Sequence, residues 1–124
     1  MKIDAVAVTS SDMEKTLMFY TLLGFKFNKT AGEHVEPKTP NGSSRLMIDK
    51  KDFIKQLTGE TPEPGSGSAF AINYDTSDEV NSIASKLTES GFKVVQQPYD
   101  APWQQRYCIV QDPDGYKVDL YSNL

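Results

Sequence analysis

Residues 23–27 read LGFKF and residues 90–94 read SGFKV, so the tripeptide GFK recurs in similar surroundings in both halves of the chain. In each half, a segment with the apolar spacing of an amphipathic helix precedes the glycine, and strand-forming residues follow it. Glycine suits this place because a helix commonly ends on a left-handed residue. The 124 residues are therefore predicted to contain two copies of one strand–helix–strand pattern.

The first half is predicted to begin with a strand at residues 3–8, followed by a helix. Ser11 and Glu14 have the spacing of a capping box, which satisfies free amides at the start of a helix. Gly24 is predicted to end the helix, and residues 25–27 to start a strand. One face of this helix carries its apolar residues, namely Met13, Leu17, Tyr20 and, less regularly, Leu23.

The second half repeats this order. Residues 69–74 are predicted to form a strand, and Thr76 with Glu79 repeats the capping-box spacing. Gly91 is predicted to end the second helix, and residues 92–95 to begin the next strand. The apolar stripe of this helix consists of Val80, Ile83, Ala84 and Leu87.

Each half is predicted to close with a β-hairpin. In the first half, strands at residues 34–38 and 45–50 flank the turn sequence PNG. In the second half, strands at residues 106–111 and 116–121 flank the turn sequence DPDG. Each half therefore follows the order β-α-β-β-β, and the segment between them, rich in Pro, Gly and Ser at residues 58–67, is predicted to be a linker.

Composition excludes several classes of function. The net charge is −4, and the 13 basic residues are dispersed, so no footprint for nucleic acid is predicted. Apolar runs stay far below the ~20 residues of a membrane span, and the first residues do not resemble a signal peptide. Cys108 is the only cysteine, which excludes an intrachain disulfide and a cysteine-based zinc site. We expect a cytoplasmic protein without nucleic-acid or membrane partners, in which residues 50–52 form a solvated charged run.

Three segments resemble the vicinal oxygen chelate superfamily, the fold of glyoxalases, bleomycin resistance proteins and extradiol dioxygenases. They are the opening helix region at residues 8–25, PWQQRY at residues 102–107, and the closing sequence DPDGYKVDL at residues 112–120. The second of these segments resembles bleomycin-resistance-like members, so we expect this chain to be closest in character to them. The resemblance implies an α+β fold, with two paired βαβββ modules forming a curled, U-shaped mixed sheet and the helices outside it.

The resemblance also sets the expected domain organisation. Residues 1–124 are expected to form one domain, with the first module at about residues 1–57 and the second at about residues 68–124. The linker at about residues 58–67 would join the modules. Because each half alone is small for a good core, it joins modules rather than separate domains. The resemblance to the superfamily also implies a homodimer.

The resemblance further implies a cleft that, in many members, holds a divalent metal through four side chains, mostly His and Glu. Here the corresponding first-strand positions are Ala5 and Ala69. The hairpin-strand position falls on Asp49, with Ile48 as an equal alternative, and the last-strand position falls on Asp119. Alanine has no lone pair to give a metal. We therefore expect no cofactor and no usual metal site, with Asp49 and Asp119 as weak candidates for Mg²⁺ or Mn²⁺.

Strand alternation predicts which side chains surround the cleft. Small residues such as Ala5 and Ala69 would form its floor. The predicted ligand-binding residues are His34, Glu36, Arg45, Met47, Asp49, Trp103, Arg106, Asp119 and Tyr121. Structural alternatives stay open, because Arg45 could simply pair with Glu36, Arg106 with Asp119, and Trp103 could cover an edge of the core.

Three functions remain open. The leading hypothesis is a binding protein for a small organic molecule, without the usual metal site, in which Trp103 would offer a stacking surface for a flat or cationic ligand. The first alternative is a metal-dependent lyase, isomerase or dioxygenase of the same superfamily, which the missing histidines oppose. The second is a non-catalytic interaction or regulatory module. Whether the protein is an enzyme is left undecided, and a metal-independent enzyme with Asp119 or Glu36 as general base stays open.

Overall fold

The structure, a computed structural model, describes residues 1–65 and 67–124, and Ser66 of the predicted linker lies outside them. The chain divides into two compact units, Met1–Pro64 and Gly65–Leu124. This division falls within the linker predicted at residues 58–67. The union of both halves in a single domain stays a prediction.

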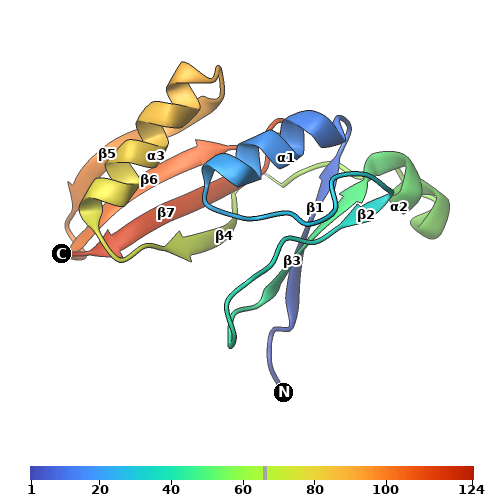
Figure 1. The fold of residues 1–124 in the computed structure, drawn as a ribbon, viewed down its shortest axis with the longest axis horizontal. Helices are drawn as coiled ribbons and strands as arrows, with labels where there is room; N and C mark the ends of the chain where they lie inside the picture. Colours follow the sequence, from blue (N-terminus) through green and yellow to red (C-terminus); the bar gives the residue numbers. More distant parts are fainter. Residues whose placement is uncertain (66) are drawn as a thin grey trace. The chain divides into compact units, whose positions relative to one another are not determined.

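The first unit contains a three-stranded sheet and two helices (Figure 1). Its elements are β1 (Ala5–Ser10), α1 (Met13–Leu22), β2 (His34–Val35), β3 (Arg45–Lys50) and α2 (Lys51–Thr58). The strand order is β1-β3-β2, with β1 parallel and β2 antiparallel to β3. Both β1 and β3 run almost directly into a helix, so α1 and α2 begin at the same end of the two parallel strands.

Three local predictions for this unit are wrong. Asp12, rather than Ser11, caps α1, because its carboxylate accepts a hydrogen bond from the Lys15 amide at 3.2 Å. The strand expected at residues 25–27 is reduced to one isolated bridge between Lys26 and Lys38. The strand expected at residues 34–38 covers only His34–Val35. Lys50 and Asp52 of the charged run are exposed as expected, and this run leads into α2, which ends at the left-handed Gly59 (φ 80°).

The sheet of the first unit has two different faces. Val8, Leu46 and Ile48 are at most 2% exposed and form the core face, from which Ser10 bonds to Thr16 of α1 at 2.6 Å. The alternate positions of β3, including Asp49, lie on the other face. Ile48 therefore points to the core and Asp49 to the opposite face, while the assignment of the family's carboxylate position to Asp49 stays a prediction.

The second unit contains a four-stranded sheet with one helix packed on it (Figure 1). Its elements are β4 (Ser68–Asn73), α3 (Ser77–Glu89), β5 (Lys93–Ala101), β6 (Gln105–Gln111) and β7 (Lys117–Asn123), in the spatial order β4-β7-β6-β5. The predicted capping box of Thr76 and Glu79 is confirmed, and Gly91 adopts the expected positive φ of 83°. Val118 and Leu120, both fully buried, lie on the same face of β7 as Ser122, whose hydroxyl bonds to that of Ser77 in α3.

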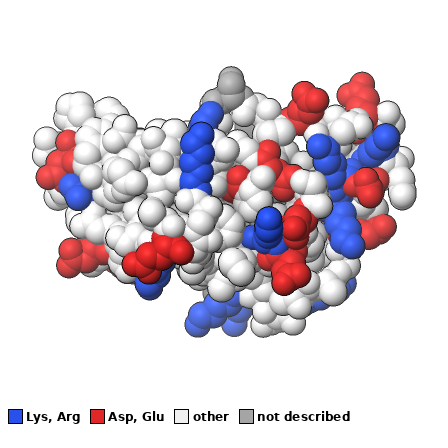
Figure 2. All heavy atoms as spheres, turned by 90° about the horizontal axis from the view of Figure 1, so that it is seen from above, with Lys and Arg blue, Asp and Glu red and all other residues white. Residues whose placement is uncertain are grey.

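The predicted α+β class is confirmed, since each unit has a mixed sheet with helices. The second unit shows the full order β-α-β-β-β, whereas the first keeps this order with its second strand reduced to the Lys26–Lys38 bridge. Acidic and basic side chains are interspersed on the face shown in Figure 2. None of the helices in the described residues is long and apolar enough to cross a membrane.

The DPDG turn between β6 and β7 is built around Asp112, which is only 3% exposed. One oxygen of its carboxylate accepts hydrogen bonds from the amides of Asp114 and Tyr116, each at 2.9 Å. Gly115, with φ of 94°, donates its amide to the Asp112 carbonyl at 3.0 Å and completes the turn. This turn fixes which residues of β6 and β7 face each other.

We expect Asp112→Ala to lower the free energy of unfolding by about 1–3 kcal/mol, because it leaves two amides of the turn without their acceptor. Urea denaturation followed by circular dichroism would measure the change. Glu89→Ala, at an exposed helix end, is the matched control and should change stability by less than about 0.5 kcal/mol. Equal effects of the two substitutions would contradict this role of Asp112.

Candidate functional site

The first unit carries a chain of polar contacts across the face opposite its core. His34 lies between two carboxylates, with Nδ1 at 2.6 Å from Asp49 Oδ1 and Nε2 at 2.8 Å from Glu36 Oε2. Glu36 also accepts two hydrogen bonds from one nitrogen of Arg45, at 2.8 and 2.9 Å, which confirms the expected ion pair. A second nitrogen of Arg45 donates to Asp4 at 3.0 Å. Four of the predicted ligand-binding residues therefore form one connected network.

Burial and charge differ along this network. The Asp49 side chain is 8% exposed and that of His34 is 42% exposed, so the network runs from the interior to the surface. The hydrogen bonds to Glu36 and then Asp49 raise the pKa of His34 above its ordinary value of 6.5. The same bond to His34, followed by that to Arg45, lowers the pKa of Glu36 below 4.5. Met47 lies between Arg45 and Asp49 on the same face, opposite Ala7 of β1.

The second unit carries an aromatic corner, made of Tyr99, Trp103 and Tyr107, on the sheet face opposite α3. The three rings are mutually near-perpendicular, with interplanar angles between 83° and 89° and centroid separations of 5.3–6.5 Å. Trp103 lies in the turn between β5 and β6, where its indole nitrogen donates to Gln105 Oε1 at 3.0 Å. Because Trp103 is 53% exposed, part of its ring surface is open to contact.

A carboxylate adjoins this corner. The Tyr107 hydroxyl donates to Asp119 Oδ2, and the Ser68 hydroxyl donates to Asp119 Oδ1, each at 2.5 Å. Burial, followed by the bond to Asp119, raises the pKa of Tyr107, so its hydroxyl stays a donor at neutral pH. Each carboxylate oxygen can accept more than one hydrogen bond, so both retain capacity toward a ligand. Tyr121, two residues further along β7, pairs with Tyr107 across the sheet.

Arg106 does not lie with these residues. It faces α3, where its Nε donates to Asn81 at 2.9 Å, and its guanidinium pairs with Asp100 at 3.2 Å. The expected ion pair between Arg106 and Asp119 is therefore wrong, because the two side chains point to opposite faces of the sheet. In the register of the sheet, Ile109 of β6 pairs with Asp119. Arg106 lies three residues from Ile109 along the strand, so its side chain points to the other face.

Sequence reasoning missed the partners of Asp119. Tyr107 and Ser68, which bond to Asp119, and Tyr99 of the aromatic corner were not among the predicted site residues, although Tyr107 ends the segment PWQQRY. The hairpin turn contained the missing signal, because counting outward from it pairs Tyr107 with Tyr121. No comparable local signal indicates Ser68, since β4 pairs with β7 across a long separation in sequence.

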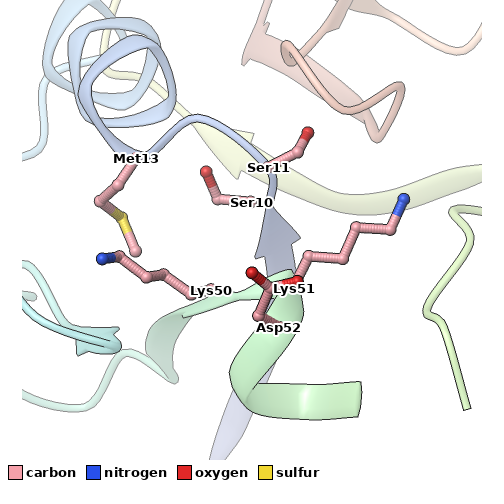
Figure 3. Close-up of a pocket in the computed structure, with 6 residues that line it drawn as sticks. All are labelled: Ser10, Ser11, Met13, Lys50, Lys51 and Asp52. Carbon is pink, nitrogen blue, oxygen red and sulfur yellow. The ribbon is translucent and has the colours of Figure 1, made fainter.

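A hollow of about 270 Å³ lies at the ends of β1 and β3 in the first unit (Figure 3). Its lining residues are Ser10, Ser11, Met13, Lys50, Lys51 and Asp52. In Figure 3 Lys50 extends beneath Met13 and Lys51 extends to the opposite side, so the two ammonium groups do not converge. The lining of the hollow therefore combines polar, charged and apolar side chains, and its two lysine ammonium groups are not directed at one point.

The residues at the superfamily's metal positions do not fit a metal site. Ala5 and Ala69 have no donor atom, which leaves only the Asp49 and Asp119 carboxylates at the four corresponding positions. Across the described residues, 1–65 and 67–124, no group of three or more His, Cys, Asp or Glu side chains could hold a metal ion. The chemical role of the polar groups in each unit therefore follows from their hydrogen bonds and charges rather than from metal binding.

The order of elements and the mixed sheets define an α+β protein with an internal βαβββ repeat. The family model of the Glyoxalase/Bleomycin resistance protein/Dioxygenase superfamily matches residues 2–120. The chain therefore belongs to this superfamily, as its sequence motifs predicted. The closer likeness to bleomycin-resistance members stays a prediction.

Three individual proteins similar to this chain each have a sequence identity of 27% or less. The glyoxalase domain-containing protein RDO1 of Mycosarcoma maydis is 27% identical over 128 residues, covering 97% of this chain and 67% of the relative. A glyoxalase-related enzyme from Fulvimarina pelagi aligns with a TM-score of 0.84 at 19% identity, covering 98% of this chain and 88% of that chain. Lactoylglutathione lyase from Agrobacterium tumefaciens aligns with a TM-score of 0.70 at 18% identity, covering 98% and 92%. The two structural likenesses support the fold alone.

Proposed function

We propose that this protein binds a small, flat organic cation, and that it does so without the metal site used by many members of its superfamily. The observation that carries the proposal is the aromatic corner of Tyr99, Trp103 and Tyr107 with the Asp119 carboxylate bonded to its edge. Aromatic faces attract cations, and small-molecule sites combine apolar surface with a few polar groups.

The charge and the geometry favour a cation over an anion. The Asp119 carboxylate is the charged group bonded to the aromatic corner, and the whole chain carries a net charge of −4. The half-exposed indole of Trp103 offers a surface on which a planar ring can stack. A cation stacked there would gain about 0.5–2 kcal/mol from the ring, and charge attraction toward Asp119 would add to this.

Trp103 is the only tryptophan, so its fluorescence reports directly on this site. We expect N-methylacridinium, a planar cation, to quench this fluorescence saturably, while acridine-9-carboxylate, a planar anion of the same ring size, binds at least about ten-fold more weakly. Asp119→Asn should weaken binding of the cation, measured by fluorescence. Trp103→Ala should weaken it about 2–30-fold by calorimetry, the factor that corresponds to the ring contribution.

The matched control is Asp75→Asn, which removes the same charge at an exposed position before α3. The proposal is wrong if the anion binds as tightly as the cation, or if Asp75→Asn weakens binding as much as Asp119→Asn. Near-stoichiometric divalent metal in the purified protein, lost in Asp119→Ala, would also overturn it and would favour the lyase or dioxygenase alternative.

The remaining expectations belong to the same proposal. A role like that of bleomycin resistance proteins, which sequester an organic molecule, is supported by the family and by the alanines at metal positions. The homodimer and the cytoplasmic location stay predictions of the resemblance and the composition.

A further inference from the structure

We propose that protonation of His34 closes a latch, formed by Asp49, His34 and Glu36, that joins β2 to β3 in the first unit, and that loss of this proton opens it. This inference is independent of the aromatic corner and of any ligand bound there. It rests on the positions of the two ring nitrogens of His34.

Both ring nitrogens face carboxylate oxygens, at 2.6 Å from Asp49 and 2.8 Å from Glu36. An ionised carboxylate only accepts hydrogen bonds, and a neutral imidazole has a single N–H to donate. The neutral ring would therefore hold one nitrogen lone pair against a carboxylate oxygen. With both carboxylates ionised, the observed geometry is satisfied by the imidazolium, which donates from both nitrogens.

The backbone pairing of β2 is short enough for this contact to matter. β2 consists of two residues, His34 and Val35, paired with Asp49 and Ile48 of β3. One further backbone bond extends the pairing, from the Lys50 amide to the Glu33 carbonyl at 2.8 Å. A charge-assisted hydrogen bond from imidazolium to Asp49 is stronger than a neutral one, so its loss weakens a large share of what holds β2.

Among the described residues, the other charged groups bonded to the latch are Arg45 and, through it, Asp4. Arg45, bonded to Glu36, stays charged throughout, and it is bonded in turn to Asp4. On the other side of β3, the residue of β1 that pairs with Asp49 is Thr9, which does not ionise. Glu33 precedes His34 and takes part through its backbone carbonyl.

The sign of the pH dependence follows from the two shifted groups. The pKa of His34 is raised above 6.5 by its bonds to Glu36 and Asp49, so its contribution is complete below pH 6.5 and is lost as the pH rises through the folded-state pKa. The pKa of Glu36 is lowered below 4.5 by its bond to His34, so its contribution is complete above pH 4.5 and is lost as the pH falls through that lower pKa. The latch is closed between these two limits. Opening at higher pH would expose Asp49, now 5% exposed, on this face.

The test is an NMR titration of the ring protons of His34, which needs no assignment because it is the only histidine. We expect a midpoint above 6.5 in the intact protein. Asp49→Asn and Glu36→Gln should each move the midpoint down, since each replaces an ionised acceptor with a neutral amide. Glu33→Gln is the matched control, because it removes a neighbouring carboxylate that is not bonded to the ring, and it should leave the midpoint nearly unchanged.

A second signal separates opening of the latch from simple titration. The Lys50 amide, bonded to the Glu33 carbonyl, should lose protection against hydrogen exchange as His34 loses its proton, while the Tyr74 amide, bonded to the Tyr121 carbonyl in the second unit, should keep its protection. A midpoint at or below 6.5, a midpoint unmoved by both carboxylate substitutions, or a Lys50 signal that ignores the His34 transition would each overturn the proposal.

Discussion

Leu120→Ala should lower the free energy of unfolding by about 2–5 kcal/mol, because it removes a fully buried side chain from the centre of the second sheet. Leu120 lies on β7, paired with Cys108 of β6 and Ile72 of β4, so a cavity there loosens three strands. Urea denaturation would measure the loss. The size of the effect depends on how far the surrounding strands collapse into the space.

The matched control is Leu57→Ala on α2, where the same chemical change is made at a residue that is 71% exposed. It should alter stability by less than about 0.5 kcal/mol. Because Leu120 and the neighbouring Asp119 point to opposite faces, a folded Leu120→Ala protein should bind N-methylacridinium within about two-fold of the original affinity. A loss of binding equal to that of Asp119→Asn would contradict the assignment of faces.

The parts of the fold that the sequence predicted are those decided by near neighbours. The capping box of Thr76 and Glu79, the positive φ of Gly24 and Gly91, and the turn around Asp112 each depend on residues only a few positions apart. Their hydrogen bonds join groups that are close in sequence, so they depend less on the rest of the chain than the pairing of distant strands does. Motifs of this kind, kept in order, were sufficient to indicate the superfamily.

Apart from the capping residue of α1, where Asp12 took the place expected for Ser11, the main errors arose in strand pairing and in one short helix. Residues 25–27 have strand-forming composition, yet only Lys26 finds a bridging partner, in Lys38, because β2 itself covers two residues. The short helix α2 begins without a side-chain cap, so it lacked the start signal that marked the other helices. Its apolar residues Phe53, Ile54 and Leu57 and the following Gly59 were the available indications.

The predictions for the candidate site were likewise correct where local sequence decides the structure and incomplete where the register between strands decides it. Alternation along β3 correctly grouped Arg45, Met47 and Asp49, because a strand's period of two is local. That His34 bridges Asp49 and Glu36 depends on the register of β2 against β3, which a loop of several residues sets. Arg106 was predicted to line the cleft with Asp119, but the register of β6 against β7 places Tyr107 on the face of Asp119 and Arg106 on the face of α3.

Tyr107→Ala should damage the proposed binding site strongly, because the Tyr107 ring contacts both other members of the aromatic corner and its hydroxyl bonds to Asp119. Its centroid lies 6.2 Å from that of Tyr99 and 5.3 Å from that of Trp103. Aromatic pairs contribute about 0.5–1.5 kcal/mol each, so losing two of them should cost about 1–3 kcal/mol of stability. Binding of N-methylacridinium, measured by Trp103 fluorescence, should weaken by about ten-fold or more, since the indole loses its support.

Tyr107→Phe separates the ring from the hydroxyl. It keeps both aromatic contacts and removes only the hydrogen bond to Asp119, whose other oxygen still accepts from Ser68. We expect a stability loss of about 1 kcal/mol and cation affinity within a few-fold of the original, because the carboxylate remains charged. If Tyr107→Phe abolished binding as fully as Tyr107→Ala, the hydroxyl itself would be the group that recognises the ligand, and stacking on the aromatic corner would not explain the affinity.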